Sequence, residues 1–197
     1  MSKLSRINNF LLVAIVFVNG YLVAMPFAPS LIFWRNHTAT QKKLTQKIQH
    51  GAKSSSSGNS AAKSDEELVV PSMGLDETVH EGKYMNTLNL GLWHRPNTST
   101  PDKGGNTVIV GHRFTYTNPR GTFYYLDKVH TGDPIGLIWH GKTYQYKVTA
   151  VKVVPPTAVE IERNTTTAQL TLYTCTPLWW PKDRLVVVAT PLTENQP

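Results

Sequence analysis

The chain has 197 residues, 40% of them hydrophobic, which is enough for one domain of ordinary size and a targeting segment but not for two full domains. Its formal net charge is +7, but no Asp or Glu occurs in residues 35–63, and basic and acidic side chains nearly balance from residue 64 onward. The excess charge therefore belongs to a tail, and the composition argues against a nucleic-acid-binding groove on the folded part. A single cysteine, Cys175, excludes an intramolecular disulfide and a zinc site built from several thiolates.

The first predicted element is a membrane span. Residues 10–34 contain no Asp, Glu, Lys, Arg or His, and about 25 mainly apolar residues can cross roughly 30 Å of hydrocarbon as a helix. Lys3 and Arg6 precede this run and favour a cytoplasmic N-terminus, with the rest of the chain outside the cell. We therefore predict an uncleaved, single-pass signal anchor in the cell membrane over residues 1–35. The alternative is a cleaved signal peptide, because residues 23–28 resemble a cleavage region.

The second segment, residues 36–65, is polar, basic and rich in Ser, Ala and Lys. Its first half is compatible with a short helix, whereas residues 54–60 lack apolar periodicity and are typical of a flexible linker. We interpret the whole segment as a flexible basic linker that lies near anionic lipid.

Residues 66–197 form the third segment, in which short β-rich runs alternate with turn residues. These runs carry β-branched and aromatic residues and are bounded by Gly, Pro, Asn and Asp. The predicted strands lie within residues 67–79, 106–112, 133–141, 142–154, 169–175 and 184–190, and a short helix is predicted near residues 122–128. Several short strands at this spacing predict a mainly β domain, either a closed barrel or a sandwich.

Three chemically reactive side chains lie at the ends of predicted strands. Cys175 ends one run and is followed by Thr176 and Pro177; His112 ends another; Arg184 begins a third. Taken singly, each has an ordinary structural interpretation, as a core thiol, a turn histidine and a rim cation. A cysteine at a strand end, supported by a sheet and facing a groove, also suits covalent catalysis. A free thiol needs an acid/base partner or a positive neighbour to be a useful nucleophile near pH 7.

The local sequences around these residues resemble the sortase family from about residue 68 to residue 191. The family's Thr-Leu-x-Thr-Cys run is present as residues 171–175, and its strand-ending Gly-His run is present in Val-Ile-Val-Gly-His-Arg at 108–113. An aromatic-rich stretch and a Gly-Asp follow the histidine, and Arg184 opens a hydrophobic strand nine residues after the cysteine. The resemblance implies a closed sortase-type β-barrel with one or two short helices, preceded by the N-terminal transmembrane helix.

The resemblance also implies residue roles. Cys175 would attack the carbonyl of a threonyl-glycyl bond in a C-terminal Leu-Pro-x-Thr-Gly-like sorting signal and form a thioester. His112 would act as the acid/base, and Arg184 and Thr174 would contact the substrate or its developing oxyanion. The implied partners are proteins with such signals and an amine acceptor from a cell-wall precursor or a pilin. No cofactor is expected, and no metal site, since Glu160 and Glu162 are too few for calcium.

Two other functions remain open on sequence alone. One is a cysteine endopeptidase, in which water rather than an amine resolves the same thioester. The other is a membrane-tethered peptide-binding module that has kept the barrel but lost turnover. The sequence also leaves open a housekeeping or pilin-polymerising role.

Overall fold

The computed structural model describes residues 3–24, 40–49, 66–114, 123–178 and 180–192. They fall into two compact units, Met1–Ala39 and Thr40–Pro197. The first unit contains helix α1 (Lys3–Ala24), which covers part of the predicted membrane span; the remainder of that span lies outside the described residues. In the ranges given above, no helix is both long enough and apolar enough to cross a membrane.

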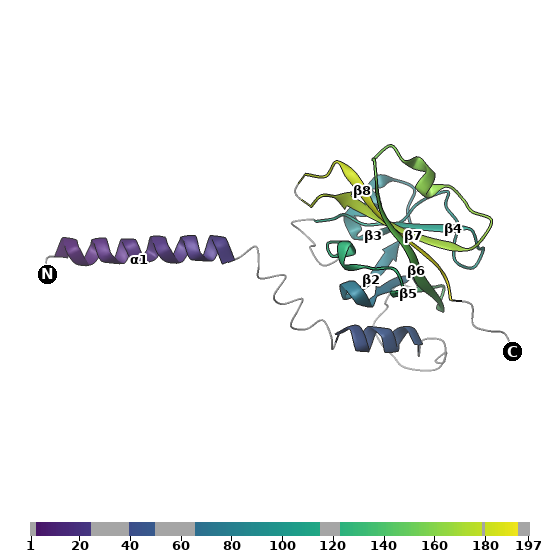
Figure 1. The fold of residues 1–197 in the computed structure, drawn as a ribbon, viewed down its shortest axis with the longest axis horizontal. Helices are drawn as coiled ribbons and strands as arrows, with labels where there is room; N and C mark the ends of the chain where they lie inside the picture. Colours follow the sequence, from purple (N-terminus) through teal and green to yellow (C-terminus); the bar gives the residue numbers. More distant parts are fainter. Residues whose placement is uncertain (1–2, 25–39, 50–65, 115–122, 179, 193–197) are drawn as a thin grey trace. The chain divides into compact units, whose positions relative to one another are not determined.

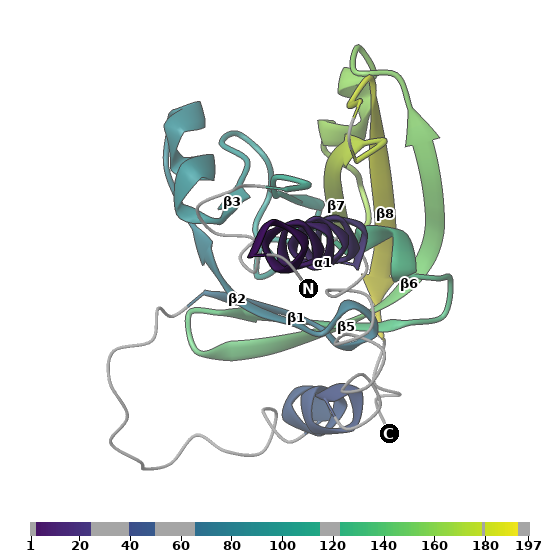
Figure 2. The ribbon, with the colours of Figure 1, turned by 90° about the vertical axis from the view of Figure 1, so that its left-hand side faces the viewer.

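The second unit is a β-barrel. Its described strands close in the neighbour order β1-β2-β3-β4-β7-β8-β6-β5. Figures 1 and 2 show this unit from two sides. The strands are β1 (Glu67–Val70), β2 (Leu75–His80), β3 (Leu92–His94), β4 (Asn106–Val110), β5 (Pro134–Trp139), β6 (Lys142–Val154), β7 (Gln169–Thr176) and β8 (Asp183–Pro191). Short 3₁₀ helices lie in the connections: η2 (Pro71–Met73), η3 (Met85–Leu90), η4 (Leu126–Lys128) and η5 (Val159–Glu162). The predicted mainly β fold and closed barrel are confirmed.

Most predicted strands appear near their expected positions, and η4 falls within the predicted helix near residues 122–128. The sequence did not predict β3, because a strand of three residues is too short to show alternation. The run predicted over residues 67–79 is two antiparallel strands, β1 and β2, joined by a turn in which Gly74 adopts a positive φ of 66°.

The two faces of β4, β7 and β8 have different surroundings. β4 and β7 are parallel, with Ile109 beside Leu172, and β8 is antiparallel to β7, with Val187 beside Leu172. These three side chains point inward and belong to the main hydrophobic core. Because successive strand residues face opposite sides, the intervening residues of the three strands share the outer face of the barrel. The candidate reactive residues belong to this outer set.

Part of the segment predicted as a linker is helical and packs on the barrel. Residues 40–49 form a helix, from which Leu44 and Ile48 are buried against Val69 of β1. The spacing of four residues places both apolar side chains on one helix face. Lys47, on the same segment, forms ion pairs with Glu67 and Asp76 of the barrel. The part of the predicted linker from 50 to 65 lies outside the described residues.

Candidate active site

The barrel brings the three predicted reactive residues to the same end of adjacent strands. Cys175 of β7 and Arg184 of β8 are direct cross-strand partners. On the other side of β7, Val110 pairs with Tyr173, and the Gly111 N–H donates to the Tyr173 carbonyl at 3.3 Å. Continued two residues past the Val110–Tyr173 pair, the same register leads to His112 and Cys175, beyond the end of β4. Cys175 and Arg184 therefore lie side by side on β7 and β8, and His112 lies two residues past the end of β4, the other neighbour of β7.

Cys175 is a free cysteine of intermediate exposure. Strand β7 ends one residue later, at Thr176, before Pro177, which has no N–H to continue a ladder. The ladder to β8 fixes the backbone of Cys175 up to this end. The thiol therefore has both a rigid support and access to solvent, which a covalent nucleophile requires.

His112 follows β4, and a backbone contact holds it there. The Phe123 N–H donates to the His112 carbonyl at 2.9 Å. The side chain is partly buried, and burial lowers the pKa of its imidazole below 6.5. Desolvation penalises the charged form of histidine, so the neutral imidazole predominates at neutral pH. A neutral ring can accept a proton from a neighbouring thiol.

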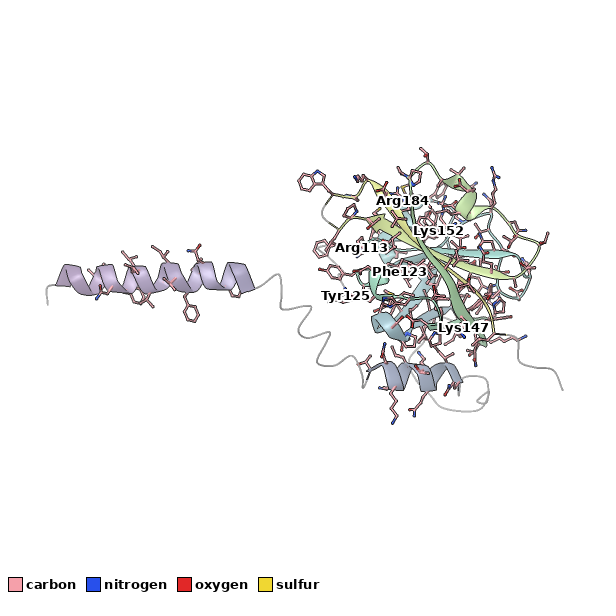
Figure 3. All side chains as sticks on the ribbon, in the orientation of Figure 1. Arg113, Phe123, Tyr125, Lys147, Lys152 and Arg184 are labelled. Atoms are coloured by element: carbon pink, nitrogen blue, oxygen red, sulfur yellow. The ribbon has the colours of Figure 1, made fainter. Side chains whose placement is uncertain are left out.

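Arg184 is the second residue of β8, and among the described residues its guanidinium makes one hydrogen bond. Its Nη1 donates to the carbonyl of Asp183 at 3.2 Å. Within the described part of the chain, no carboxylate forms an ion pair with Arg184. Figure 3 shows Arg184 at the opposite end of the barrel from Lys147. A guanidinium beside the nucleophile, with donors to spare, is suited to bind a carbonyl oxygen or an oxyanion.

Thr174, the fourth predicted site residue, faces the interior. Its side chain is only 1% exposed, and its hydroxyl donates to the Gly111 carbonyl at 2.8 Å. The hydroxyl thus ties β7 to the residue that precedes His112. A contact between Thr174 and the substrate stays a prediction. The contact that the structure shows is the hydrogen bond to Gly111, the residue that follows β4.

Arg113, the neighbour of His112, is a residue that the sequence analysis did not select. Its side chain is 10% exposed, and Nη2 lies 2.9 Å from Asp127 Oδ1 in η4. The Nε and Nη1 atoms are buried without a hydrogen-bond partner among the described residues. The Arg113–Asp127 pair joins η4 to the end of β4, next to the Phe123–His112 hydrogen bond. In the sequence, the only feature that distinguishes Arg113 is its position next to His112, at the end of a predicted strand.

A second group of side chains missed by the sequence analysis connects η5 to β7. Glu162 accepts two hydrogen bonds from Arg95, Nε to Oε1 and Nη2 to Oε2, each 2.9 Å long. The Tyr173 hydroxyl donates to Glu162 Oε1 at 2.5 Å. Burial and this hydrogen bond raise the pKa of Tyr173, so the phenol stays a donor at all physiological pH values. The carboxylate of Glu162 is thus paired with the guanidinium of Arg95. Within the described ranges, no group of three or more potential metal ligands occurs.

A closed β-barrel with a free cysteine, a histidine and an arginine at the same end of neighbouring strands is the arrangement in which the class of the protein can be assigned. The chain belongs to the sortase family, since the sortase domain model matches residues 68–192. The resemblance seen in the three motifs is therefore confirmed. Members of this family are cysteine transpeptidases.

Individual relatives agree with this placement. The sortase SrtE1 of Streptomyces coelicolor is 33% identical over 100 residues, which are 46% of this chain and 28% of that protein. The match thus spans less than a third of that relative's length. Among solved structures, the Clostridium perfringens sortase D5 transpeptidase has a TM-score of 0.58 at 23% identity, covering 79% of this chain and 99% of the other. A lid mutant of sortase A from Corynebacterium diphtheriae has a TM-score of 0.61 at 24% identity, covering 80% and 96%. At these identities the two structures support the fold alone.

Proposed function

We propose that this chain is a cysteine transpeptidase that cleaves a C-terminal sorting signal and joins the new carboxyl end to an amine. The observation that carries the proposal is the cross-strand pairing of Cys175 with Arg184, with His112 just after the end of β4, the parallel neighbour of β7. Family membership supports the reaction class. The donor would carry a Leu-Pro-x-Thr-Gly-like signal, and the acceptor would be an amine of a cell-wall precursor or a pilin.

The proposed first step is acylation of the enzyme. The Cys175 Sγ attacks the threonyl carbonyl carbon and gives its proton to the neutral His112 imidazole. The C–N bond of the threonyl-glycyl link then breaks, and His112 returns the proton to the leaving amine. Arg184 donates hydrogen bonds to the carbonyl oxygen as it gains negative charge, an effect worth about 3 kcal/mol for one well-placed donor.

The proposed second step releases the product. The acceptor amine attacks the thioester carbon, a new C–N bond forms, and the C–S bond breaks. His112 takes a proton from the amine and the thiolate of Cys175 is reprotonated. If water takes the place of the amine, the same thioester gives hydrolysis, so the ratio of ligation to hydrolysis separates a transpeptidase from an endopeptidase.

We propose further that residues 10–34 anchor the enzyme in the cell membrane, with the N-terminus in the cytoplasm and the barrel outside. Large apolar side chains of α1 are exposed on the isolated helix, among them Phe10, Val13 and Phe17. A helix that exposes apolar side chains in this way is favoured by a lipid environment. Protease digestion of intact cells tests this orientation, because an external barrel is cut and a cytoplasmic one is protected.

The test of the activity uses the full-length protein, a peptide pool of the form Leu-x-x-Thr-Gly, and an added amine. We expect a mass increase on Cys175 that corresponds to the acyl part of a peptide, followed by a ligated product. Cys175→Ala should give neither, and Arg184→Lys should lower the acylation rate by about 10²-fold, as expected for a lost oxyanion donor. Equal ligation by Cys175→Ala would refute the assignment, and a Cys175 that acylates without any ligation would favour the endopeptidase.

A further inference from the structure

Polar contacts hold the backbone on either side of His112 but not its ring. Among the residues that the structure describes, no hydrogen bond or ion pair is made by the imidazole. The residue before it is fixed, because the Gly111 N–H donates to the Tyr173 carbonyl at 3.3 Å and the Gly111 carbonyl accepts from the Thr174 hydroxyl at 2.8 Å. β4 ends at Val110. The direction of the His112 side chain therefore also depends on what fixes the backbone after it.

That backbone is attached to the segment that contains η4. The Phe123 N–H donates to the His112 carbonyl at 2.9 Å, which sets the plane of the peptide that joins His112 to Arg113. The side chain of Arg113 then reaches η4, where its Nη2 lies 2.9 Å from Asp127 Oδ1. Two successive residues are thus bound to residues 123–127, one through its main chain and the next through its side chain.

Residues 123–127 are themselves anchored in the hydrophobic core. The side chains of Phe123 and Leu126 are fully buried, and the Leu126 N–H donates to the Phe123 carbonyl at 3.2 Å. The Phe123 ring also packs on the backbone before His112, since a methyl group added at Gly111 would lie 3.0 Å from Phe123 Cδ2. Asp127 follows Leu126 directly, so the core fixes the place from which its carboxylate meets Arg113.

The surroundings of Arg113 are unusual for a cation. Its side chain is 10% exposed, and Asp127 is its one carboxylate partner within the described ranges. Its Nε and Nη1 atoms are buried and have no hydrogen-bond partner there. Burying a charge carries a desolvation penalty, so an apolar side chain of similar volume often gives equal or greater stability. A charge-assisted hydrogen bond, in contrast to an apolar contact, fixes a direction as well as a distance.

We propose that Arg113, through its pair with Asp127, is a positioning residue that holds His112 where its imidazole exchanges protons with Cys175. The proposal rests on the transpeptidase function proposed above. Arg113 touches no reacting atom; it restrains the backbone that carries the acid/base. Proton transfer needs the two heavy atoms within about 2.6–3.2 Å. Loss of the pair therefore slows acylation of Cys175 and leaves the binding of the donor peptide unchanged.

The test compares Asp127→Asn, Arg113→Met and the double variant in the full-length protein. Single-turnover acylation of Cys175 is measured over a range of concentrations of a donor peptide selected from the Leu-x-x-Thr-Gly pool. We expect the maximal acylation rate to fall by about 10-fold to 100-fold in each single variant, as for a catalytic group displaced by up to about 1 Å. The half-saturating donor concentration should stay within about twofold. Because the two side chains share one contact, the double variant should show less than the product of the single effects.

Two further variants separate positioning from a general effect on the fold. Asp127→Glu keeps the carboxylate and should retain more of the acylation rate than Asp127→Asn does. Asp76→Asn is the matched control, since Asp76 of β2 also pairs with a cation, Lys47, and β3 and β4 separate β2 from β7. It should leave both the maximal rate and the half-saturating concentration unchanged.

Hydrogen exchange at the Phe123 amide gives a readout that needs no catalysis, because this N–H is bound to the His112 carbonyl. Its exchange should be faster in Asp127→Asn and Arg113→Met than in the parent and in Asp76→Asn. An unchanged maximal acylation rate in both single variants, or a raised half-saturating concentration at constant maximal rate, would overturn the proposal. Absence of any thioester on Cys175 in the parent would instead refute the transpeptidase function, and the exchange at Phe123 would still show whether Arg113 restrains this backbone.

Discussion

Two buried threonines on the core side of the site strands lead to opposite predictions for one chemical change. Thr174 and Thr107 are each 1% exposed. The Thr174 hydroxyl donates to the Gly111 carbonyl at 2.8 Å, whereas the Thr107 hydroxyl has no hydrogen-bond partner among the described residues. A Thr→Val substitution keeps the shape of the side chain and removes only the hydroxyl. It therefore isolates the value of that one hydrogen bond.

For Thr174→Val, the variant loses a buried hydrogen bond and leaves the Gly111 carbonyl without its side-chain donor. Removing one partner of a buried pair costs about 1–3 kcal/mol. That is a substantial part of a total unfolding free energy of about 5–15 kcal/mol. For Thr107→Val, a buried hydroxyl that makes no hydrogen bond is replaced by a methyl group, so we expect stabilisation of about 1 kcal/mol.

Urea unfolding of the parent and the two variants measures both effects. We expect the midpoint to fall for Thr174→Val and to rise for Thr107→Val, with the slope m unchanged in both. Thr174→Ser keeps the hydroxyl and should lose only about 1 kcal/mol, for the missing methyl group. If Thr174→Val is as stable as the parent, the hydrogen-bond assignment at Gly111 is wrong; a fall in the midpoint of Thr107→Val would instead show that the Thr107 hydroxyl has a hydrogen-bond partner.

Two further predictions concern His112 and the docked helix. Burial lowers the pKa of His112 below 6.5, so the unfolded state binds a proton on this residue more tightly than the folded state does. The unfolding free energy should therefore fall as the pH drops through and below 6.5. His112→Gln should reduce this dependence of the unfolding free energy on pH, measured in paired titrations of the two proteins. A slope identical in both proteins would contradict the pKa shift. A methyl group at Gly136 would lie 2.6 Å from Ile48 Cγ1, so Gly136→Ala should detach the helix at residues 40–49 and speed its hydrogen exchange. The double variant Gly136→Ala/Ile48→Ala should recover part of the protection, and no change in exchange for Gly136→Ala would show that the helix is not packed against β5.

The sequence predicted the site through a local pattern. Cys175, His112 and Arg184 each lie at the end of a predicted β-rich run, and such a run can be recognised from its own residues. Strand pairing is not encoded in that way. The parallel contact of β4 with β7 and the antiparallel contact of β7 with β8 appear only in the assembled barrel.

The parts of the site that were missed depend on those distant contacts. Arg95 and Glu162 are 67 positions apart, and no pattern within either segment links them. The hydrogen bond from Thr174 to the Gly111 carbonyl spans 63 positions and was equally invisible in the local sequence. A short helix was compatible with the sequence of residues 40–49, but its packing on the barrel was not predicted, because Leu44 and Ile48 find their apolar partner only in Val69 of β1.

The arrangement of the strands also determines when the site forms during folding. The Gly111–Thr174 contact closes a separation of 63 residues, and β7 lies between β4 and β8 in the barrel. Non-local pairings of this kind form late and slowly, because their loop-closure entropy must be overcome before they contribute. β8, the last strand of the described chain, carries Arg184. A chain that lacks β8, or in which β8 has not yet paired, therefore has Cys175 without Arg184 beside it, and the proposed site is assembled only when the barrel closes.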